Sequence, residues 1–349
     1  MLKKQYRALL AVVLFLAFAS QVEAQDPHYT QFYANQQLLS PAFAGAGSGP
    51  RVAMNYRAQW VAIPGSYRQF GVGYDQPLYF GNTIQGFGFQ LHNDKAGEGN
   101  LNKLDLYGNY SFAIQMGGYS NKHYLRFGLG AGVQQASIDF SKLRFGDQID
   151  TEEGFIYATN EKLQGAGGSR FTPDFNFGVA WYNEFAWVSA SVHHLTEPTN
   201  QEWKLFSGVS KADATWPRRY TLTGGVAIPA GPMNDPKSVV ISPTFLFMSQ
   251  RNFNQLALGT YVHIEPIVFG AWYRSNFNNY LSQAFASDMI AGLVGFKEGI
   301  FSVGYSYDYT ISRLSNRISG GSHEIALILE FESEASKKFN HKSLPCPRF

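Results

Sequence analysis

The sequence predicts an all-β fold, a transmembrane antiparallel β-barrel of about 14 strands in an outer membrane, and three observations predict it. Charged residues make up only 15% of the 349 residues, whereas aromatic residues make up 16%; soluble domains carry about 25% charged residues. After residue 24 no apolar run reaches the roughly 18 residues that a membrane helix needs. Segments of about ten residues instead alternate between apolar and polar side chains, which is typical of strands between lipid and a lumen.

Residues 1–24 are predicted to form a secretory signal peptide. Basic residues open it, an apolar run follows at 8–19, and small residues at 22–24 offer a cleavage site. The apolar run is shorter than the roughly 20 residues of a membrane anchor, so cleavage is favoured over an uncleaved helix. Removal would take away three basic residues and one acidic residue, leaving 25 of each sign. The mature chain would then carry no net charge, and its composition gives no indication of nucleic-acid binding.

Two segments flank the predicted barrel. Residues 25–49 precede the first strand and are rich in polar and aromatic side chains. They are expected to plug the lumen or to line its periplasmic mouth, and the sequence leaves both open. Residues 333–349 follow the last strand as a C-terminal tail, which is expected in the periplasm either as a contact for other proteins or as a disordered end.

Residues 50–332 are predicted to form the barrel itself. In its first strand two faces alternate, with Val52, Met54, Tyr56, Ala58 and Trp60 on one and Arg51, Ala53, Asn55, Arg57 and Gln59 on the other. Fourteen such segments occur, at residues 50–60, 66–75, 84–93, 101–115, 123–139, 171–182, 185–195, 218–229, 239–250, 254–264, 267–275, 287–297, 300–310 and 322–332. An even number is what single-chain bacterial barrels have. Pro243 lacks a ladder donor and is expected to mark a bulge or a misplaced strand boundary.

The connections between these segments alternate in length. Long ones at 140–170 and 196–217 fall on one side, whereas the turns at 183–184, 265–266 and 298–299 fall on the other, together with 76–83. Outer-membrane barrels have long extracellular loops and short periplasmic turns, so both ends of the chain are expected on the periplasmic side. A soluble β-sandwich or propeller is the alternative, and outward aromatic residues without charges over all these strands disfavour it.

The lumen is expected to carry glycine, serine, asparagine and charged residues. The charged residues predicted to point inward are Arg57, Asp75, Lys103, Asp105, Arg126, Arg274, Asp308, Glu324 and Glu330. An unpaired buried charge is costly, so a network of ion pairs that fills the interior is favoured. A selectivity filter is the alternative.

Catalytic and metal sites are not expected. Ser322, His323 and Glu324 are consecutive in a strand and so face opposite sides of the sheet, which prevents a nucleophile–base pair; the same holds for His193 and His194. The acidic segment 147–153 could hold Ca²⁺, but it lacks the spacing of a calcium loop, so solvated carboxylates are favoured. No phosphate-binding loop or zinc pattern is present. We therefore expect no enzyme, no cofactor and no nucleic-acid partner.

Several stretches resemble the PorP/SprF family, outer-membrane proteins of the type IX secretion system of Bacteroidetes. The resemblance begins after the signal peptide with QDPHYTQFY at 25–33 and LSPAFAG at 39–45. Further similar stretches are NYRAQW at 55–60, DQID at 147–150, Arg219-Tyr220, YSYDY at 305–309 and GGSHEI at 320–325. The family's first strand often reads Arg-Asn-Gln-Trp-Pro, and here Ala58 and Val61 replace the Asn and the Pro.

The resemblance implies a non-enzymatic component that supports the secretion or cell-surface attachment of cargo with a C-terminal secretion domain, including gliding adhesins in some members. The implied partners are that cargo domain, other secretion components in the periplasm or outer membrane, and the lipid bilayer. The candidates for partner contact or barrel architecture are Asp26, Tyr29, Gln31, Tyr33, Pro41, Arg57, Trp60, Asp308 and His323. The alternative functions are a porin and an outer-membrane transporter of small or apolar solutes.

Overall fold

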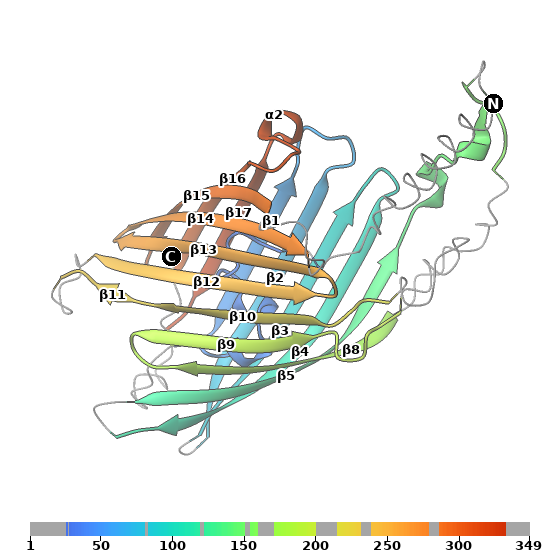
Figure 1. Cartoon of the computed structure of the whole chain (residues 1–349). Helices are drawn as coiled ribbons and strands as arrows, with labels where there is room; N and C mark the ends of the chain where they lie inside the picture. Colours follow the sequence, from blue (N-terminus) through green and yellow to red (C-terminus); the bar gives the residue numbers. More distant parts are fainter. Residues whose placement is uncertain are drawn as a thin grey trace, which may run out of the picture.

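The computed structural model describes residues 26, 28–80, 83–118, 122–150, 154–159, 171–199, 215–231, 239–278 and 286–332, and their strands close into one antiparallel barrel (Figure 1). The predicted signal peptide at 1–24 and the tail at 333–349 lie outside these residues. Among the described residues no helix combines the length and the apolar character needed to cross a membrane.

Within the described chain, fourteen strands form the wall, as predicted from the sequence. They are β1 (Arg51–Gln59), β2 (Tyr67–Phe80), β3 (Thr83–Ala96), β4 (Leu101–Met116), β5 (His123–Ser137), β8 (Phe171–Tyr182), β9 (Ala186–His193), β10 (Arg219–Val226), β12 (Val240–Gln250), β13 (Phe253–Ile264), β14 (Ile267–Asn278), β15 (Ala286–Glu298), β16 (Phe301–Thr310) and β17 (Ser322–Glu330). Each strand pairs with its neighbour in sequence, and β1 pairs with β17 to close the ring.

The two ends of the barrel differ in their connections. We call the end with the longer connections the outer end; it carries α2 (Asn316–Ser319) and the small hairpin of β6 (Ile149–Asp150) and β7 (Gly154–Phe155), which projects from the barrel (Figure 1). The opposite, inner end has the short turns, and there β1 begins beside the end of β17, where the Phe331 amide donates to the Pro50 carbonyl. The first strand therefore starts at the inner end.

The connection predicted at 76–83 is much shorter in the structure than the sequence suggested, so this prediction is wrong in its extent. β2 continues to Phe80 and β3 begins at Thr83, because the ladder between them runs on through Leu78 opposite Gln85 to Phe80 opposite Thr83. Cross-strand pairing thus extends this hairpin beyond the point at which the sequence suggested a break.

Pro243 neither makes a bulge nor ends its strand. It lies inside β12 and pairs with Thr260 of β13 in an unbroken register. On the other side of β12 the ladder stops at Thr244 opposite Gly225 and resumes at Ile241 opposite Ile228. The missing donor of Pro243 therefore splits the neighbouring segment into β10 and the short β11 (Ile228–Pro229).

Side chains alternate between the two faces of the wall as predicted, but the inner face is not polar throughout. Exposed apolar side chains such as Phe89, Leu106 and Leu129 point outward, whereas the predicted inward charges are buried or partly buried. The expectation of a polar lumen holds for only part of the wall. On β12 to β17 the buried inward side chains include the apolar Leu246, Met248, Val268, Met289, Leu293 and Ile328. The lumen thus has a polar side and an apolar side.

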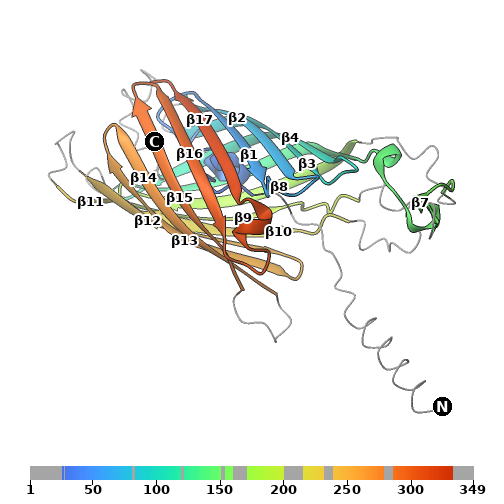
Figure 2. The same ribbon diagram turned by 90° about the horizontal axis from the view of Figure 1, so that it is seen from above.

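Residues 28–49 lie inside the ring of strands (Figure 1 and Figure 2). They form turns and two short 3₁₀ helices, η1 (Gln36–Leu38) and η2 (Pro41–Phe43), and nearly all of their side chains are buried. We call residues 26 and 28–49 the lumen segment.

Candidate functional site in the barrel lumen

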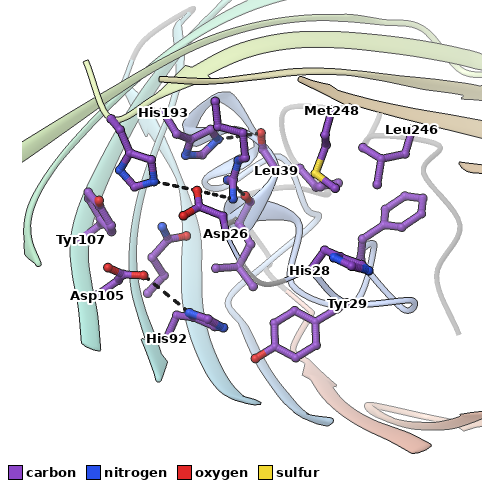
Figure 3. Close-up of a pocket in the computed structure, with 15 residues that line it drawn as sticks. Asp26, His28, Tyr29, Leu39, His92, Asp105, Tyr107, His193, Leu246 and Met248 are labelled. Carbon is purple, nitrogen blue, oxygen red and sulfur yellow. Dashed lines mark hydrogen bonds and ion pairs between the residues drawn. The ribbon is translucent and has the colours of Figure 1, made fainter. Parts of the chain in front are cut away.

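The lumen segment begins at the outer end with Asp26, whose carboxylate is bound by three cationic side chains. Lys103 Nζ of β4 and Nε2 of His194 each lie 2.7 Å from it, and Arg219 Nη1 of β10 donates to it at 3.0 Å. The Asp26 amide also donates to Gln250 Oε1 of β12 at 2.9 Å. We call Asp26, Lys103, His194 and Arg219 the Asp26 cluster; Figure 3 shows Asp26 among the residues that line the neighbouring pocket.

His194 is held between two carboxylates. Its Nδ1 lies 2.6 Å from Asp174 Oδ2, to which the Tyr107 hydroxyl also donates. Alternation along the strand predicted that His193 and His194 face opposite sides, and this is wrong, because both side chains are buried in the lumen. β9 ends at His193, and the positive φ of His194, 59°, turns its side chain inward.

The charges of this cluster shift its ionisation. Burial opposes the ionisation of Asp26, but His194, Lys103 and Arg219 outweigh it and hold the pKa of Asp26 well below its usual range. Burial would likewise lower the pKa of His194, but Asp26 and the hydrogen bond to Asp174 outweigh burial and raise it. Both shifts favour the charged forms of the two groups, and the contacts of the cluster are those of an ion-pair network.

A second cluster holds the next turn of the lumen segment. Glu324 of β17 accepts hydrogen bonds from the amides of Thr30, at 2.7 Å, and Gln31, at 3.0 Å. Arg57 of β1 lies 2.6 Å from Asp308 of β16 and 3.3 Å from Glu324, and Thr30 Oγ1 donates to Asp308. Arg57 is completely buried. We call Arg57, Asp308 and Glu324 the Arg57 cluster; it joins three strands to the backbone of the segment.

Aromatic residues of the segment cover the apolar side of the lumen. Phe32 packs edge-on against Trp272 of β14, with ring centroids 4.9 Å apart, and Tyr33 packs in the same way against Tyr261 of β13, at 4.5 Å. Trp272 Nε1 donates to the Tyr261 hydroxyl at 2.7 Å. The polar and apolar sides of the lumen thus each meet matching residues of the segment.

The later part of the segment is fixed through its backbone. Ser40 caps η2, with Pro41 at the first position of that helix. The Ala44 carbonyl accepts from Arg126 Nη2 at 3.0 Å and from Ser111 Oγ at 2.6 Å. Pro50 follows at the inner end.

Glycines in the wall leave the space that this part of the segment occupies. A Cβ on Gly128 of β5 would collide with the backbone at Pro41 and Ala42, and one on Gly178 of β8 would collide with Ser40 Oγ. The wall and the segment are therefore complementary in shape as well as in charge.

Most of the predicted site residues meet in the lumen; those buried there are Asp26, Tyr29, Gln31, Tyr33, Pro41, Arg57 and Asp308. Two do not. Trp60 lies at the outer end of β1 with a φ of 58° and packs edge-on against Tyr67 at 5.4 Å. His323 is outside the lumen clusters: its Nδ1 is 2.8 Å from the Tyr305 hydroxyl on the outward face of the barrel.

Sequence reasoning missed His194, Asp174 and Thr30 as site residues. Asp26 and His194 are separated by 168 positions, and no spacing pattern connects them. The position of Asp174 could have been predicted, because it is an acidic residue in a predicted strand and a charged side chain there is expected to face the lumen. Most of the charges predicted to point inward form ion pairs, as was favoured over a selectivity filter: Arg57, Asp75, Lys103, Asp105, Arg274, Asp308 and Glu324. Arg126 instead donates to Ser111 and to the Ala44 carbonyl, and Glu330 accepts from Ser48.

The lumen also holds a neighbouring serine and histidine and a small cavity. Ser191 Oγ and His193 Nε2 lie 3.4 Å apart, but both contact the Leu39 carbonyl of the segment, at 2.5 and 3.0 Å. A cavity of about 50 Å³ lies between the Asp26 cluster and Leu246 and Met248 (Figure 3), which is room for one or two water molecules.

The acidic connection at 147–153 is described only in part. Asp147 accepts a hydrogen bond from Thr159 and Asp150 accepts one from Tyr157, whereas residues 151–153 lie outside the described chain. Among the residues that the structure describes, no group of three or more His, Cys, Asp or Glu side chains could hold a metal ion.

Comparison with known proteins identifies a family. The family model described as "Type IX secretion system membrane protein PorP/SprF" matches residues 21–329, which include the lumen segment and nearly all of the barrel. No curated protein matches the chain.

Solved structures with a similar fold are barrels of low sequence identity. CdiB from Acinetobacter baumannii has a TM-score of 0.42 at 9% identity over 81% of this chain, which spans 60% of CdiB. BamA from Haemophilus ducreyi lacking POTRA domains 1–3 has 0.39 at 8% identity, covering 82% of this chain and 70% of that one. The TodX monoaromatic hydrocarbon channel, a deltaS2S3 mutant, has 0.42 at 9% identity, covering 83% and 91%.

Proposed function

The chain belongs to the PorP/SprF family of type IX secretion system membrane proteins, and on this premise we propose that it supports the export or cell-surface attachment of cargo with a C-terminal secretion domain. In this role the barrel acts in the outer membrane as a binding platform. Its partners are the cargo domain and other components of the secretion system. Where the cargo is an adhesin, the same role contributes to gliding.

The filled lumen is the observation that carries this proposal. The Asp26 cluster, the Arg57 cluster and the pair of Phe32 with Trp272 bind the lumen segment to opposite sides of the wall. Buried ion pairs are rigid and costly to break, which disfavours a freely open pore. A porin or a solute transporter would use the space that the segment occupies, whereas a platform for a protein partner does not need it.

We also propose that the protein works by binding and not by catalysis. Ser191 and His193 are the neighbouring nucleophile and base in the lumen, and the Leu39 carbonyl of the segment occupies both. A substrate would have to displace this buried carbonyl before it could reach either group.

The test is a strain that lacks the gene, compared with its parent and with a complemented strain. Surface and culture-fluid proteins are quantified by mass spectrometry. We expect one or a few large proteins with C-terminal secretion domains to disappear from the surface or to be released into the medium, and complementation to restore them. An unchanged surface proteome together with altered uptake of small solutes would overturn the proposal in favour of a porin.

A further inference from the structure

The start of the lumen segment lies at the outer end of the barrel. Among the described residues, every partner of Asp26 is at that end: Arg219 opens β10, Gln250 closes β12, His194 follows the end of β9, and Lys103 is near the start of β4.

The other end of the segment lies at the inner end. The Gly45 amide donates to Asp75 in the inner half of β2, and Ser48 Oγ donates to Glu330 at the end of β17. Between these ends the chain contacts the Arg57 cluster in the outer half and Tyr261 in the inner half. The segment therefore crosses the whole lumen, and β1 then starts from the inner end.

We infer that the mature amino terminus is presented at the cell-surface mouth of the barrel, where the Asp26 cluster holds it. With cleavage after Ala24, as the sequence predicts, Gln25 alone precedes Asp26. This inference places the amino terminus on the side opposite to the periplasmic side on which both ends of the chain are expected from the sequence. This inference uses the orientation of the proposed secretion barrel, in which the longer connections are extracellular.

The Asp26 cluster has the construction of a carboxylate clamp. Lys103 of β4, His194 just after β9 and Arg219 of β10 bind one carboxylate, and the side chain that bears it is only 3% exposed. Such charge-assisted bonds are about twice as strong as neutral ones.

The placement is tested with one epitope tag at three positions in the full-length protein. The tag is inserted between Gln25 and Asp26, after Thr159 in the outer connection, or after Gly118 in an inner turn, and antibody binding to intact cells is measured. We expect the first two tags to be labelled on intact cells and the third only after the outer membrane is permeabilised.

Two results would overturn the placement. An amino-terminal tag that needs permeabilisation while the Thr159 tag does not would show that the segment fails to reach the surface. Labelling of the Gly118 tag but not the Thr159 tag would show a reversed barrel. Neither result bears on the secretion role, which the surface proteome tests separately.

The clamp is tested by protease removal of the amino-terminal tag from intact cells. We expect Asp26→Asn to speed removal about tenfold, because a neutral side chain loses the charge of its three bonds. Asp26→Glu, which keeps the charge, is the matched control and should remain closer to the wild type. Heat-modifiable migration on gels checks that each barrel has folded. An unchanged rate in a folded Asp26→Asn variant would overturn the clamp, and the tag accessibility of the unsubstituted chain still tests the placement.

Discussion

At the scale of single residues, Arg57 connects the barrel wall to the lumen segment. Its guanidinium lies between Asp308 and Glu324, without solvent exposure, and Thr30 of the lumen segment joins the same group. Removing the arginine would leave two carboxylates buried beside each other with no cation. Breaking a buried pair in this way costs about 3–5 kcal/mol.

Arg57→Ala is therefore expected to lower the free energy of unfolding by about 3–5 kcal/mol. Thermal unfolding in detergent, followed by circular dichroism and by gel migration, measures the change. Arg218→Ala is the matched control, because Arg218 is half exposed and pairs with Glu197 at 3.6 Å. A surface pair of this kind contributes less than about 1 kcal/mol. Equal losses in the two variants would contradict a special role for the Arg57 cluster.

His194 gives the clamp a dependence on pH. Its pKa is raised in the folded state, so its contribution is complete below its unfolded pKa and is lost as pH rises through the folded one. The pKa of Asp26 is lowered, so its contribution is lost only in acid. The titratable and polar groups around His194 are Asp26, Asp105, Asp174, Lys103, Arg219, Tyr107, His193 and Gln134.

In detergent, we expect protease removal of an amino-terminal tag to accelerate as pH rises from about 6 to about 9, because neutral His194 binds Asp26 less strongly. His194→Gln should flatten this dependence while leaving the rate high throughout. A wild-type rate that stays constant over the range, after correction for protease activity on an unfolded reporter, would contradict the role of His194.

At the scale of elements, the strands of the wall are complementary to the lumen segment in shape as well as in charge. Gly128 of β5 lies where the chain passes Pro41 and Ala42, so an added methyl group has no space. Gly108 of β4 points outward, and a Cβ there would meet Phe89 at an ordinary 3.7 Å. These two glycines lie in adjacent strands, and one faces the lumen segment while the other faces outward.

Gly128→Ala is expected to destabilise the folded barrel by about 1–3 kcal/mol through overpacking. Gly108→Ala should change the stability by less than about 0.5 kcal/mol, as expected for a substitution away from such contacts. Midpoints of thermal unfolding in detergent for the two variants provide the comparison. A loss in Gly108→Ala as large as that in Gly128→Ala would assign the effect to strand propensity and not to the segment.

Alternation along the strands also determines how far the sequence could predict the site. Successive side chains of a strand point to opposite faces, so the inward positions of Arg57, Lys103 and Asp308 follow from the pattern. The position of His194 does not, because it follows the end of β9 and a positive φ redirects it. Partners across the lumen, such as Asp26 and Lys103, lie in separate parts of the chain, and local periodicity contains no information about them.

At the scale of the whole molecule, the barrel resembles a soluble protein in having a packed core. Phe32 and Tyr33 cover the apolar wall of Trp272 and Tyr261, while Asp26 and the Thr30 amide meet the charged wall. If the apolar face of every strand is assigned to lipid and the polar face to water, the predicted lumen is polar throughout. The apolar surface that Phe32 and Tyr33 provide inside the ring cannot be predicted in this way, because it depends on the lumen segment lying inside the barrel.

Deleting residues 25–45 tests whether this core closes the barrel. The ladders from β1 through β17 do not include the segment, so the ring is expected to remain closed and heat-modifiable on gels. Its lumen would fill with water, which can solvate the exposed Arg57 cluster. We therefore expect the deletion variant to conduct ions in planar bilayers and to fail in secretion, and the full chain to remain closed.

The combination of readouts separates the possible roles of the segment. Conductance by the full chain equal to that of the deletion variant would show that the segment does not close the lumen, and would favour the porin. Loss of the heat-modifiable form would show instead that the segment is needed for folding. Gly108→Ala serves as the control for a harmless change, since its added methyl group points away from the lumen. A variant that conducts but still secretes its cargo would assign the segment to closing the pore alone and place the binding of cargo on the outer connections.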